Sequence, residues 1–145
     1  MELATALAFA RDRSRGILIT LKADGRPQSS HIGYVVEPSA DGAADTIAMS
    51  VTASRAKSKN ARRDPRVSLH IPRDDFGAYV VIEGTAELTL PAADPNDDTV
   101  DQLVAYYRSM IGEHPDWDDY RAAMARDGRL VLRIHPTHAY GMLPD

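Results

Sequence analysis

The chain has 145 residues, of which 43% are hydrophobic and 26% are charged, a balance typical of one folded domain over residues 1–145. The absence of cysteine excludes disulfides, thiolate metal sites and cysteine nucleophiles, and the net charge of -4 argues against a nucleic-acid-binding protein. No apolar run is long enough to cross a bilayer and no secretory signal begins the chain, so we expect a cytoplasmic protein without membrane association.

The first part of the chain predicts a helix followed by a hairpin. Apolar residues at helical spacing over 2–13 predict a short amphipathic helix. A strand follows at 17–21, and the dipeptide Asp24-Gly25 predicts a two-residue type I′ turn, in which both central positions need positive φ. The return strand extends over 28–36.

A loop at 37–45 leads to a third strand, and a basic helix follows it. The strand covers 46–51, and the helix is expected over 52–64. Thr52 or Ser54 can serve as the N-cap of this helix. Pro65 prevents its continuation, because the residue before a proline is driven out of the α region.

The remaining elements continue this pattern of strands with flanking helices. In chain order they are strands at 66–71 and 78–90, helices at 97–111 and 116–126, and a last strand at 129–142. Gly84 suggests a bulge inside its strand. The strands run mostly as hairpins and lack the βαβ rhythm of a parallel sheet. We therefore expect a mainly β fold in which six antiparallel strands close into a barrel and protect their edges.

Charge is distributed unevenly along this acidic chain. Six basic residues lie between Arg55 and Arg66, whereas eight acids lie between Asp94 and Asp119. The acidic part indicates a solvated face or a self-complementary contact between two copies. At 100° per residue, one side of the basic helix carries what we call the basic stripe, formed by Arg55, Lys59, Arg62 and Arg63. Lys57 falls on the other side, near Asn60.

The residues leave two interpretations of Lys57 open. Its aliphatic stem can pack on the edge of the core while its ammonium remains in solvent. Alternatively, Lys57 belongs to an anion site at the N-terminus of the helix, with hydroxyl donors from Ser50, Thr52 and Ser54. A phosphate bound there would find several donors.

Other motifs give weaker indications. Glycine-rich phosphate loops of the GxGxxG and Walker types are absent. His135 and His138 flank Pro136 in a predicted strand and do not share a helical face, so no metal site is expected. Trp117 and Tyr120 stand at helical spacing, which predicts packing in the core or between two copies.

The order of elements and several motifs resemble a known family. The motifs are "GILITLKADGRPQSS", "SRAKSKNARRDPRVSL", "YVVIEGTAEL", "GEHPDWDDYR" and "HPTHAYGMLP". They resemble the split β-barrel family related to pyridoxamine 5′-phosphate oxidase, and within it the small branch that uses the deazaflavin coenzyme F420. The resemblance covers almost the whole chain. It implies a six-stranded antiparallel split barrel that forms a homodimer, with a cofactor groove shared between the two copies.

The same resemblance implies cofactor-binding positions. Those that match the phosphate, the hydroxylated side chain and the anionic tail of the cofactor are Ser50, Thr52, Arg55, Lys57 and Asn60. Those that match the surroundings of its redox-active ring are Pro27, Gln28, Ser29 and Tyr79. Gly33 and Gly77 stand where larger side chains are expected in relatives, so the shape of the substrate pocket is not predicted.

The activity that the resemblance implies is transfer of a hydride from reduced F420 to a small organic substrate. No residue is identified as catalytic, although a water, His31 or Tyr79 could supply a proton. One alternative is an oxidase or reductase of the same fold that binds FMN, for which the basic stripe would be idle. Another is a non-catalytic F420-binding protein.

Overall fold

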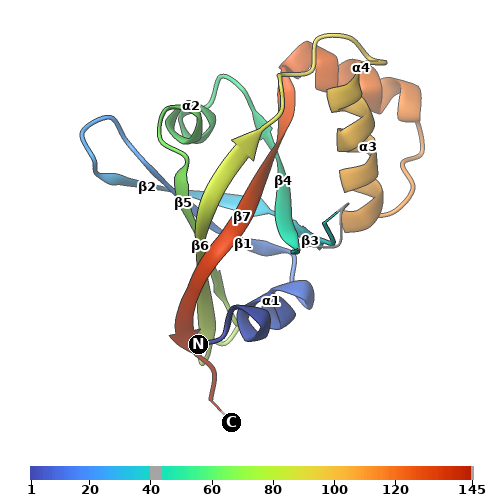
Figure 1. The fold of residues 1–145 in the computed structure, drawn as a ribbon. Coiled ribbons are helices and arrows are strands. Elements are labelled where there is room, and N and C mark those ends of the chain that lie inside the picture. Colours follow the sequence, from blue (N-terminus) through green and yellow to red (C-terminus); the bar gives the residue numbers. More distant parts are fainter. Residues whose placement is uncertain (40–43, 145) are drawn as a thin grey trace.

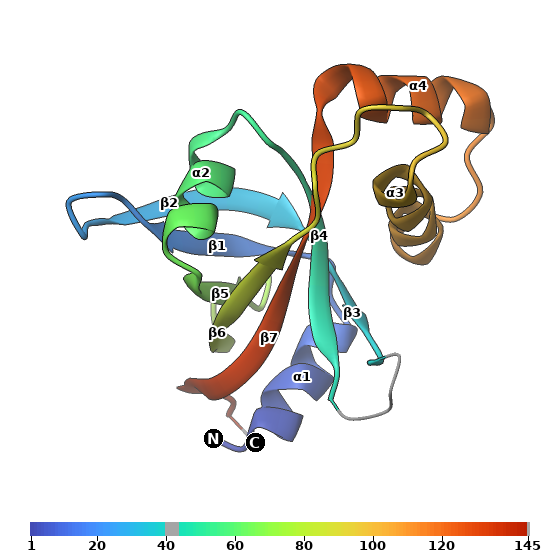
Figure 2. The same ribbon diagram turned by 45° about the horizontal axis from the view of Figure 1, so that its top comes forward.

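The computed structural model describes residues 1–39 and 44–144, so the middle of the predicted loop at 37–45 lies outside the described residues. In the described part, one antiparallel sheet curls around a core and four helices flank it (Figure 1, Figure 2). The strands are β1 (Arg15–Leu21), β2 (Pro27–Gly33), β3 (Val35–Glu37), β4 (Thr46–Thr52), β5 (Arg66–Pro72), β6 (Tyr79–Leu88) and β7 (Arg129–Met142). The helices are α1 (Leu3–Arg11), α2 (Ala56–Arg63), α3 (Asp98–Met110) and α4 (Trp117–Asp127). None of these helices, within the described residues, is long and apolar enough to span a bilayer.

The strand order explains how the sheet curls. Across the described residues the order is β2-β1-β5-β6-β7-β4-β3, and neighbouring strands are antiparallel. β2 and β3 follow one another in the chain but lie at opposite ends of this order. Since Tyr34 alone separates them, the two edges of the sheet are brought together at that residue.

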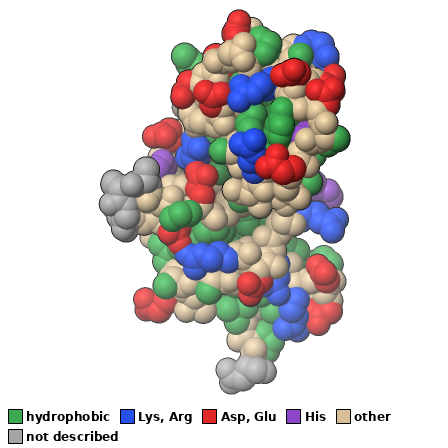
Figure 3. Space-filling view, turned by 90° about the vertical axis from the view of Figure 1, so that its right-hand side faces the viewer, with side chains coloured by type: hydrophobic (Ala, Val, Ile, Leu, Met, Phe, Trp, Pro, Cys, Tyr) green, Lys and Arg blue, Asp and Glu red, His purple; other side chains and the backbone are tan. Residues whose placement is uncertain are grey.

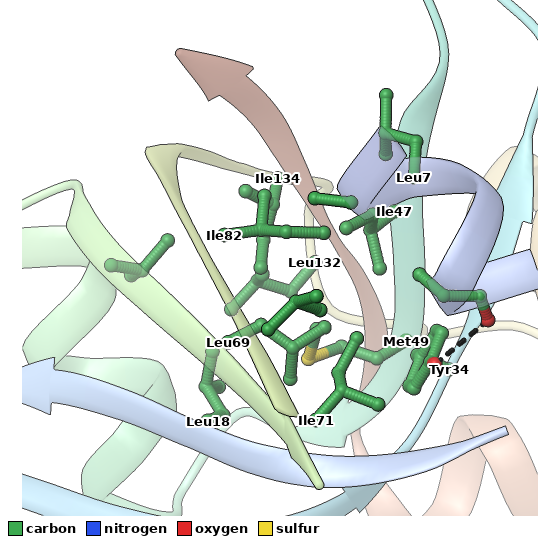
Figure 4. Packing of buried hydrophobic residues seen from close by; sticks show 14 of the residues in the cluster. Leu7, Leu18, Tyr34, Ile47, Met49, Leu69, Ile71, Ile82, Leu132 and Ile134 are labelled. Atoms are coloured by element: carbon green, nitrogen blue, oxygen red, sulfur yellow. Dashed lines mark hydrogen bonds between the residues drawn. The ribbon is translucent and has the colours of Figure 1, made fainter. Parts of the chain in front are cut away.

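The expected count of six strands is wrong, because the predicted strand at 28–36 divides at Tyr34. The Tyr34 N–H donates to the carbonyl of Ser14 at 2.9 Å, and its hydroxyl donates to the carbonyl of Ala10 at 2.8 Å. The Tyr34 side chain is fully buried in the core, where Figure 4 shows the bond from its hydroxyl. Tyr34 therefore ties α1 to the sheet at the point where the chain crosses from one edge to the other.

The predicted two-residue turn at Asp24-Gly25 is also wrong in its length. The Lys22 N–H donates to the carbonyl of Arg26, and the Gly25 N–H donates to the carbonyl of Lys22, both at 2.9 Å. Gly25 has a φ of 86°, whereas Asp24 does not have positive φ. These bonds define a three-residue loop with a left-handed glycine at its end, a common hairpin connection that needs positive φ once.

Helix α2 begins later than predicted, since Arg55 is its N-cap in place of Thr52 or Ser54. Thr52 remains in β4, where it pairs with Arg129 of β7 and accepts a hydrogen bond from its Nη1 at 2.9 Å. The Ser58 hydroxyl donates to the Thr52 carbonyl at 2.7 Å and holds the first turn of α2 against the end of β4.

Two hydrophobic clusters stabilise the fold. The larger fills the curl of the sheet beneath α1, and its largest fully buried side chains include Leu18, Tyr34, Ile47, Met49, Leu69, Ile71, Ile82, Leu132 and Ile134 (Figure 4). The smaller cluster joins β4 and β7 to α3 and α4. Tyr120 belongs to it, and burial raises the pKa of Tyr120 to about 12. Trp117 packs against this cluster with its ring 5.6 Å from that of Tyr120, which confirms the core-packing interpretation of Trp117.

The structure also bears on two further sequence predictions, and it confirms the first of them. The register of β6 and β7 shifts between Glu83 and Gly84, which is the predicted bulge, and a Cβ at Gly84 would lie 2.3 Å from the carbonyl oxygen of His135. The acidic residues near α3 and α4 lie on a solvated surface that also carries basic side chains (Figure 3), as in the ion pair of Arg121 with Asp101 at 3.0 Å.

Candidate functional site

The candidate site lies on the outer face of the sheet, which we define as the side that points away from the larger core cluster. Side chains alternate along each strand, so Leu18 and Leu69 point into the core while Ile17 and His70 point outward. The register places one outward row across five strands, formed by His31, Ile17, His70, Val81 and Tyr140.

A cavity of about 410 Å³ opens where the start of α2 meets β2, β4 and β7. The polar side chains that line it are His31 of β2, Ser50 and Thr52 of β4, Arg55 and Lys57 at the start of α2, and Arg129 of β7. We call it the cationic cavity, because three Arg or Lys side chains line it and no carboxylate of the described residues does. Such a lining attracts anions.

The hydrogen bonding of the cationic cavity is incomplete. Arg55, Lys57 and Arg129 form no ion pair with any described residue. The Nε of Arg129 and the Oγ of Ser50 are buried and have no hydrogen-bond partner among the described residues. An unpaired buried polar group costs about 1–3 kcal/mol. An acceptor-rich anion in this cavity would recover that free energy.

Lys57 lies near the charges of both Arg55 and Arg129. Burial lowers the pKa of the Lys57 ammonium below its ordinary value, and repulsion from Arg55 and Arg129 lowers it further. The Lys57 side chain is half-buried, which is compatible with both of the interpretations left open by the sequence. It packs at an edge of the fold and also lines a cavity without carboxylates.

Four of the residues predicted to bind the cofactor are brought together at the cationic cavity, namely Ser50, Thr52, Arg55 and Lys57. Asn60 is not among them, because it is buried on another side of α2. Its Nδ2 donates to the Oε1 of Gln28 at 2.8 Å and to the Oγ1 of Thr20 at 3.2 Å. Asn60 and Gln28 thus dock α2 onto the β1–β2 hairpin.

The remaining predicted residues are spread along the outer face. Pro27 and Ser29 are exposed on β2, near the hairpin loop. Tyr79 begins β6 and pairs with Pro72 of β5. Its ring lies 5.2 Å from that of His70. None of Pro27, Ser29 and Tyr79 lines the cationic cavity.

The predicted basic stripe is exposed along its whole length, but its members differ in their contacts. Arg63 donates through Nη2 to the carbonyl of Leu21 at 2.6 Å and to the Oδ1 of Asn60 at 3.1 Å, which ties it to the fold. Lys59 and Arg62 form no ion pair with any described residue.

Two features of this region were missed by the sequence reasoning. Arg129 enters the cavity because β7 starts beside the end of β4, a contact between distant parts of the chain. Its local signal in the sequence is weak, since it is only a basic residue directly after Gly128, the left-handed C-cap of α4.

The second feature that was missed is Met110 of α3, which occupies the space beside Gly33. A Cβ on Gly33 would lie 2.3 Å from the Cε of Met110. Gly77, by contrast, lies against the Arg73 side chain in a turn.

A second cavity, of about 700 Å³, adjoins the cationic cavity on the outer face. The two share His31, Ile32 and Gly33. We call the second one the apolar cavity, because most of its remaining lining is apolar, including Ile17, Pro72, Phe76 and Met110. Arg15 and Asp74 also line it and are both exposed. The two cavities are therefore neighbours, and we call the pair the groove, with a cationic end and an apolar end.

Comparison with known proteins places this fold. The family model for pyridoxamine 5′-phosphate oxidase matches residues 4–143. Rv2991 from Mycobacterium tuberculosis is 24% identical with a TM-score of 0.69, covering 97% of this chain and 84% of that one. An F420 reductase is 22% identical with a TM-score of 0.61, covering 90% and 92%. The heme storage protein HutZ from Vibrio cholerae is 16% identical with a TM-score of 0.65, covering 97% and 94%. At such identities these neighbours show the fold alone, but the family model spans nearly the whole chain, and the protein therefore belongs to the pyridoxamine 5′-phosphate oxidase family.

Proposed function

We propose that this chain binds coenzyme F420 and acts as an F420-dependent reductase of small organic molecules. The observation that carries the proposal is the convergence of Arg55, Lys57 and Arg129 on one cavity that no carboxylate of the described residues lines. The motifs that resemble the deazaflavin branch support it, and so does the presence of an F420 reductase among the structural neighbours.

The residues of the cationic cavity fit a phosphate. The Nε of Arg129 and the Oγ of Ser50 have no partner among the described residues and are free to donate. Lys57 adds a full positive charge, and the guanidinium of Arg55 has the planar donor geometry that suits phosphate oxygens. The first N–H groups of α2 have no acceptor within the helix and add positive potential at the same place.

The exposed part of the basic stripe favours a cofactor with more negative charge than one phosphate. Lys59 and Arg62 follow Arg55 at helical spacing on the exposed side of α2. F420 carries a tail of glutamates that could lie along this side. Each exposed contact contributes little, so we expect the stripe to add modestly to the affinity of the cavity.

Reduced F420, when bound, supplies a hydride, and the chain supplies binding, orientation and exclusion of water. His31 lines both cavities, which places its imidazole where a proton could be held or delivered beside the reacting molecule. Tyr79 lines neither. We expect His31→Gln to lower kcat with any substrate found by a larger factor than it weakens F420 binding, since His31 also lines the cationic cavity. A normal rate in this variant would assign the proton to water.

Fluorescence titration of F420 into the purified protein tests the proposal. We expect binding at micromolar cofactor or tighter. Lys57→Ala should weaken binding roughly 10- to 100-fold, since a hydrogen bond to a charged group contributes about 1.5–3 kcal/mol. The matched control is Lys59→Ala on the exposed side of α2, for which a change of less than about 5-fold is expected. No signal at micromolar F420 would reject the proposed function.

A second candidate is an FMN-dependent oxidoreductase. It is favoured by the number of cations in the cationic cavity. Arg55, Lys57 and Arg129 would suffice to bind the single phosphate of FMN, without any contribution from the exposed stripe. A yellow protein on purification, with tighter binding of FMN than of F420, would transfer the assignment to FMN. A third possibility, a non-catalytic F420-binding protein, would be rejected by turnover of any compound in a screen with reduced cofactor.

The resemblance further implies a homodimer, which we include in the proposal. Tyr140 and Met142 of β7 are 47% and 54% exposed on the outer face. They pair in register with Val81 and Tyr79 of β6. A second copy of the chain would cover these apolar side chains.

A further inference from the structure

We propose that the apolar cavity binds an uncharged, flat aromatic group of the reduction substrate, and that Phe76 is the surface on which this group stacks. This inference rests on the proposed function, since it assigns the partner molecule to the groove whose cationic end holds the cofactor. It concerns the lining of the apolar cavity, which contains none of the residues predicted to bind the cofactor.

The first observation is the conformation of Phe76. Its side chain is 83% exposed, and its φ of 59° lies in the left-handed region, where bulky residues other than glycine are strained. Backbone strain lowers stability, and an exposed apolar side chain gains no hydrophobic stabilisation on folding. Within a single chain, Phe76 is therefore poorly explained as a stabilising residue, although it lines the apolar cavity, and its role in a contact between two copies is tested separately below.

The second observation is that the surrounding loop holds Phe76 in place. The Phe76 N–H donates to the carbonyl of Arg73 at 2.9 Å, and the Arg73 N–H donates to the carbonyl of Ala78 at 2.8 Å. Asp75 accepts from the Arg73 Nε at 2.7 Å and from the Gly77 N–H at 2.8 Å. These bonds restrain the backbone of the turn between β5 and β6 and so keep Phe76 beside the cavity, although its exposed ring can still rotate.

The third observation is the part of the lining that comes from α3. Met110 reaches from α3 to Gly33, and its sulfur accepts a hydrogen bond from the Tyr106 hydroxyl at 2.8 Å. That hydroxyl also lies 3.3 Å from the Gly33 carbonyl. Methionine is flexible and polarisable, and its sulfur makes favourable contacts with aromatic rings. Since Phe76 and Met110 both line the apolar cavity, a flat ligand there would meet one aromatic and one thioether side chain.

Size and charge select the class of ligand. A cavity of about 700 Å³ is within the range of small-molecule sites. Arg15 and Asp74 contribute opposite charges, so Arg and Lys do not outnumber Asp and Glu in the lining. The cationic cavity next to it is suited to anions. The apolar cavity therefore suits the uncharged part of a second molecule, placed beside His31 where the two cavities meet.

The experiment uses N-phenyl-1-naphthylamine, an uncharged aromatic dye whose fluorescence increases in apolar sites. We expect it to bind the wild-type protein and to remain bound when inorganic phosphate or F420 is added. Phe76→Ala should weaken dye binding about 10-fold, the loss expected for one aromatic pair. Leu90→Ala is the matched control, because Leu90 is also exposed, at 78%, and lies outside the cavity. Its dye affinity should equal that of the wild type.

Thermal unfolding supplies an independent measurement. Phe76→Gly removes the strain of the positive φ, so it should raise Tm slightly and at the same time lower the affinity for the dye. A phenylalanine that only stabilised the fold would not produce these opposite effects. A lower Tm in Phe76→Gly, unchanged dye affinity in Phe76→Ala, or displacement of the dye by F420 would each overturn the inference. Loss of a dimer in Phe76→Ala, detected by light scattering, would assign Phe76 to a contact between copies and would also overturn it.

The outcomes separate this inference from the proposed function. If F420 binds and dye affinity does not depend on Phe76, the inference fails and the proposed function stands. If F420 does not bind and the dye still depends on Phe76, the proposed function fails and the apolar cavity stands as a ligand site.

Discussion

Lys57 shows how one side chain links anion binding to pH. Its pKa in the folded chain lies below the ordinary value of 10.5, first because of burial and then because of Arg55 and Arg129. Between the lowered pKa and 10.5 the unfolded chain binds more protons than the folded one, so the free energy of unfolding rises with pH across that window. Below the window the folded protein bears the full cost of holding three neighbouring positive charges, and a bound anion would offset this cost.

Affinity for F420 should therefore depend on pH at the alkaline side. As pH rises through the lowered pKa of Lys57, the ammonium loses its proton and the cofactor should bind more weakly. In Lys57→Arg the affinity should stay constant to higher pH, because a guanidinium remains protonated. Dissociation constants measured by fluorescence over an alkaline pH series test this. Identical pH profiles for the wild type and Lys57→Arg would contradict it, and Lys59→Arg should retain the wild-type profile.

Arg129 is the residue for which geometry matters more than charge. Arg129→Lys keeps the positive charge but removes the Nε, which has no partner among the described residues, and the Nη1 bond to Thr52. We expect F420 affinity to fall about 10-fold in this variant, because lysine cannot reproduce a planar arginine–phosphate contact. Arg126→Lys, an exposed change at the end of α4, is the control for general charge effects. Equal affinities of Arg129→Lys and the wild type would exclude Arg129 from the site.

At the level of elements, the placement of α2 decides where the cationic residues point. The helix is anchored at its start by Ser58, which bonds to the Thr52 carbonyl, and along its buried side by Asn60. The resemblance implied Asn60 as a cofactor-binding residue. In the structure its amide group is already occupied by Gln28, Thr20 and Arg63. We therefore expect Asn60 to act on the site by positioning α2.

Asn60→Ala separates positioning from direct binding. Removing the amide leaves the Oε1 of Gln28 without its donor, so the free energy of unfolding should fall by about 1–3 kcal/mol. F420 affinity should fall less than in Lys57→Ala. Thermal unfolding and cofactor titration on the same preparations measure both effects. A loss of affinity as large as that of Lys57→Ala, with Tm unchanged, would restore Asn60 as a direct ligand.

The elements also show where local sequence patterns were sufficient. Alternation of apolar residues correctly predicted β1, β4, β5, β6 and β7 to within a few residues, and the bulge at Gly84 was found from one glycine. The break at Tyr34 was missed, since the strand-like pattern continues through it. The Tyr34 hydroxyl bonds to Ala10 and its N–H to Ser14, which are distant in sequence. Contacts of this kind leave no local pattern.

For the whole molecule, the main expectation is association of two copies through the outer face. Tyr140→Glu places a charge among apolar side chains that a second copy would cover, so it should convert a dimer to a monomer. Leu90→Glu is the control, because Leu90 is 78% exposed, away from the outer-face row. Light scattering after size-exclusion chromatography gives the mass of each variant. A monomeric wild type, or a dimeric Tyr140→Glu, would reject this interface.

Local sequence information was enough for the mainly β fold class and the basic helix, because periodicity and turn residues act over a few positions. It separated Lys57 from Lys59 and Arg62 but wrongly placed Arg55 with them, since Arg55 lines the cationic cavity together with Lys57. The family could be recognised for the same reason, since its motifs are short and contiguous. Folding was needed to bring Arg129 to Thr52, to fill the space at Gly33 with Met110, and to use Asn60 as an anchor for α2. Those outcomes depend on which strands and helices meet, and pairing between distant segments is determined by burial and register of the whole sheet.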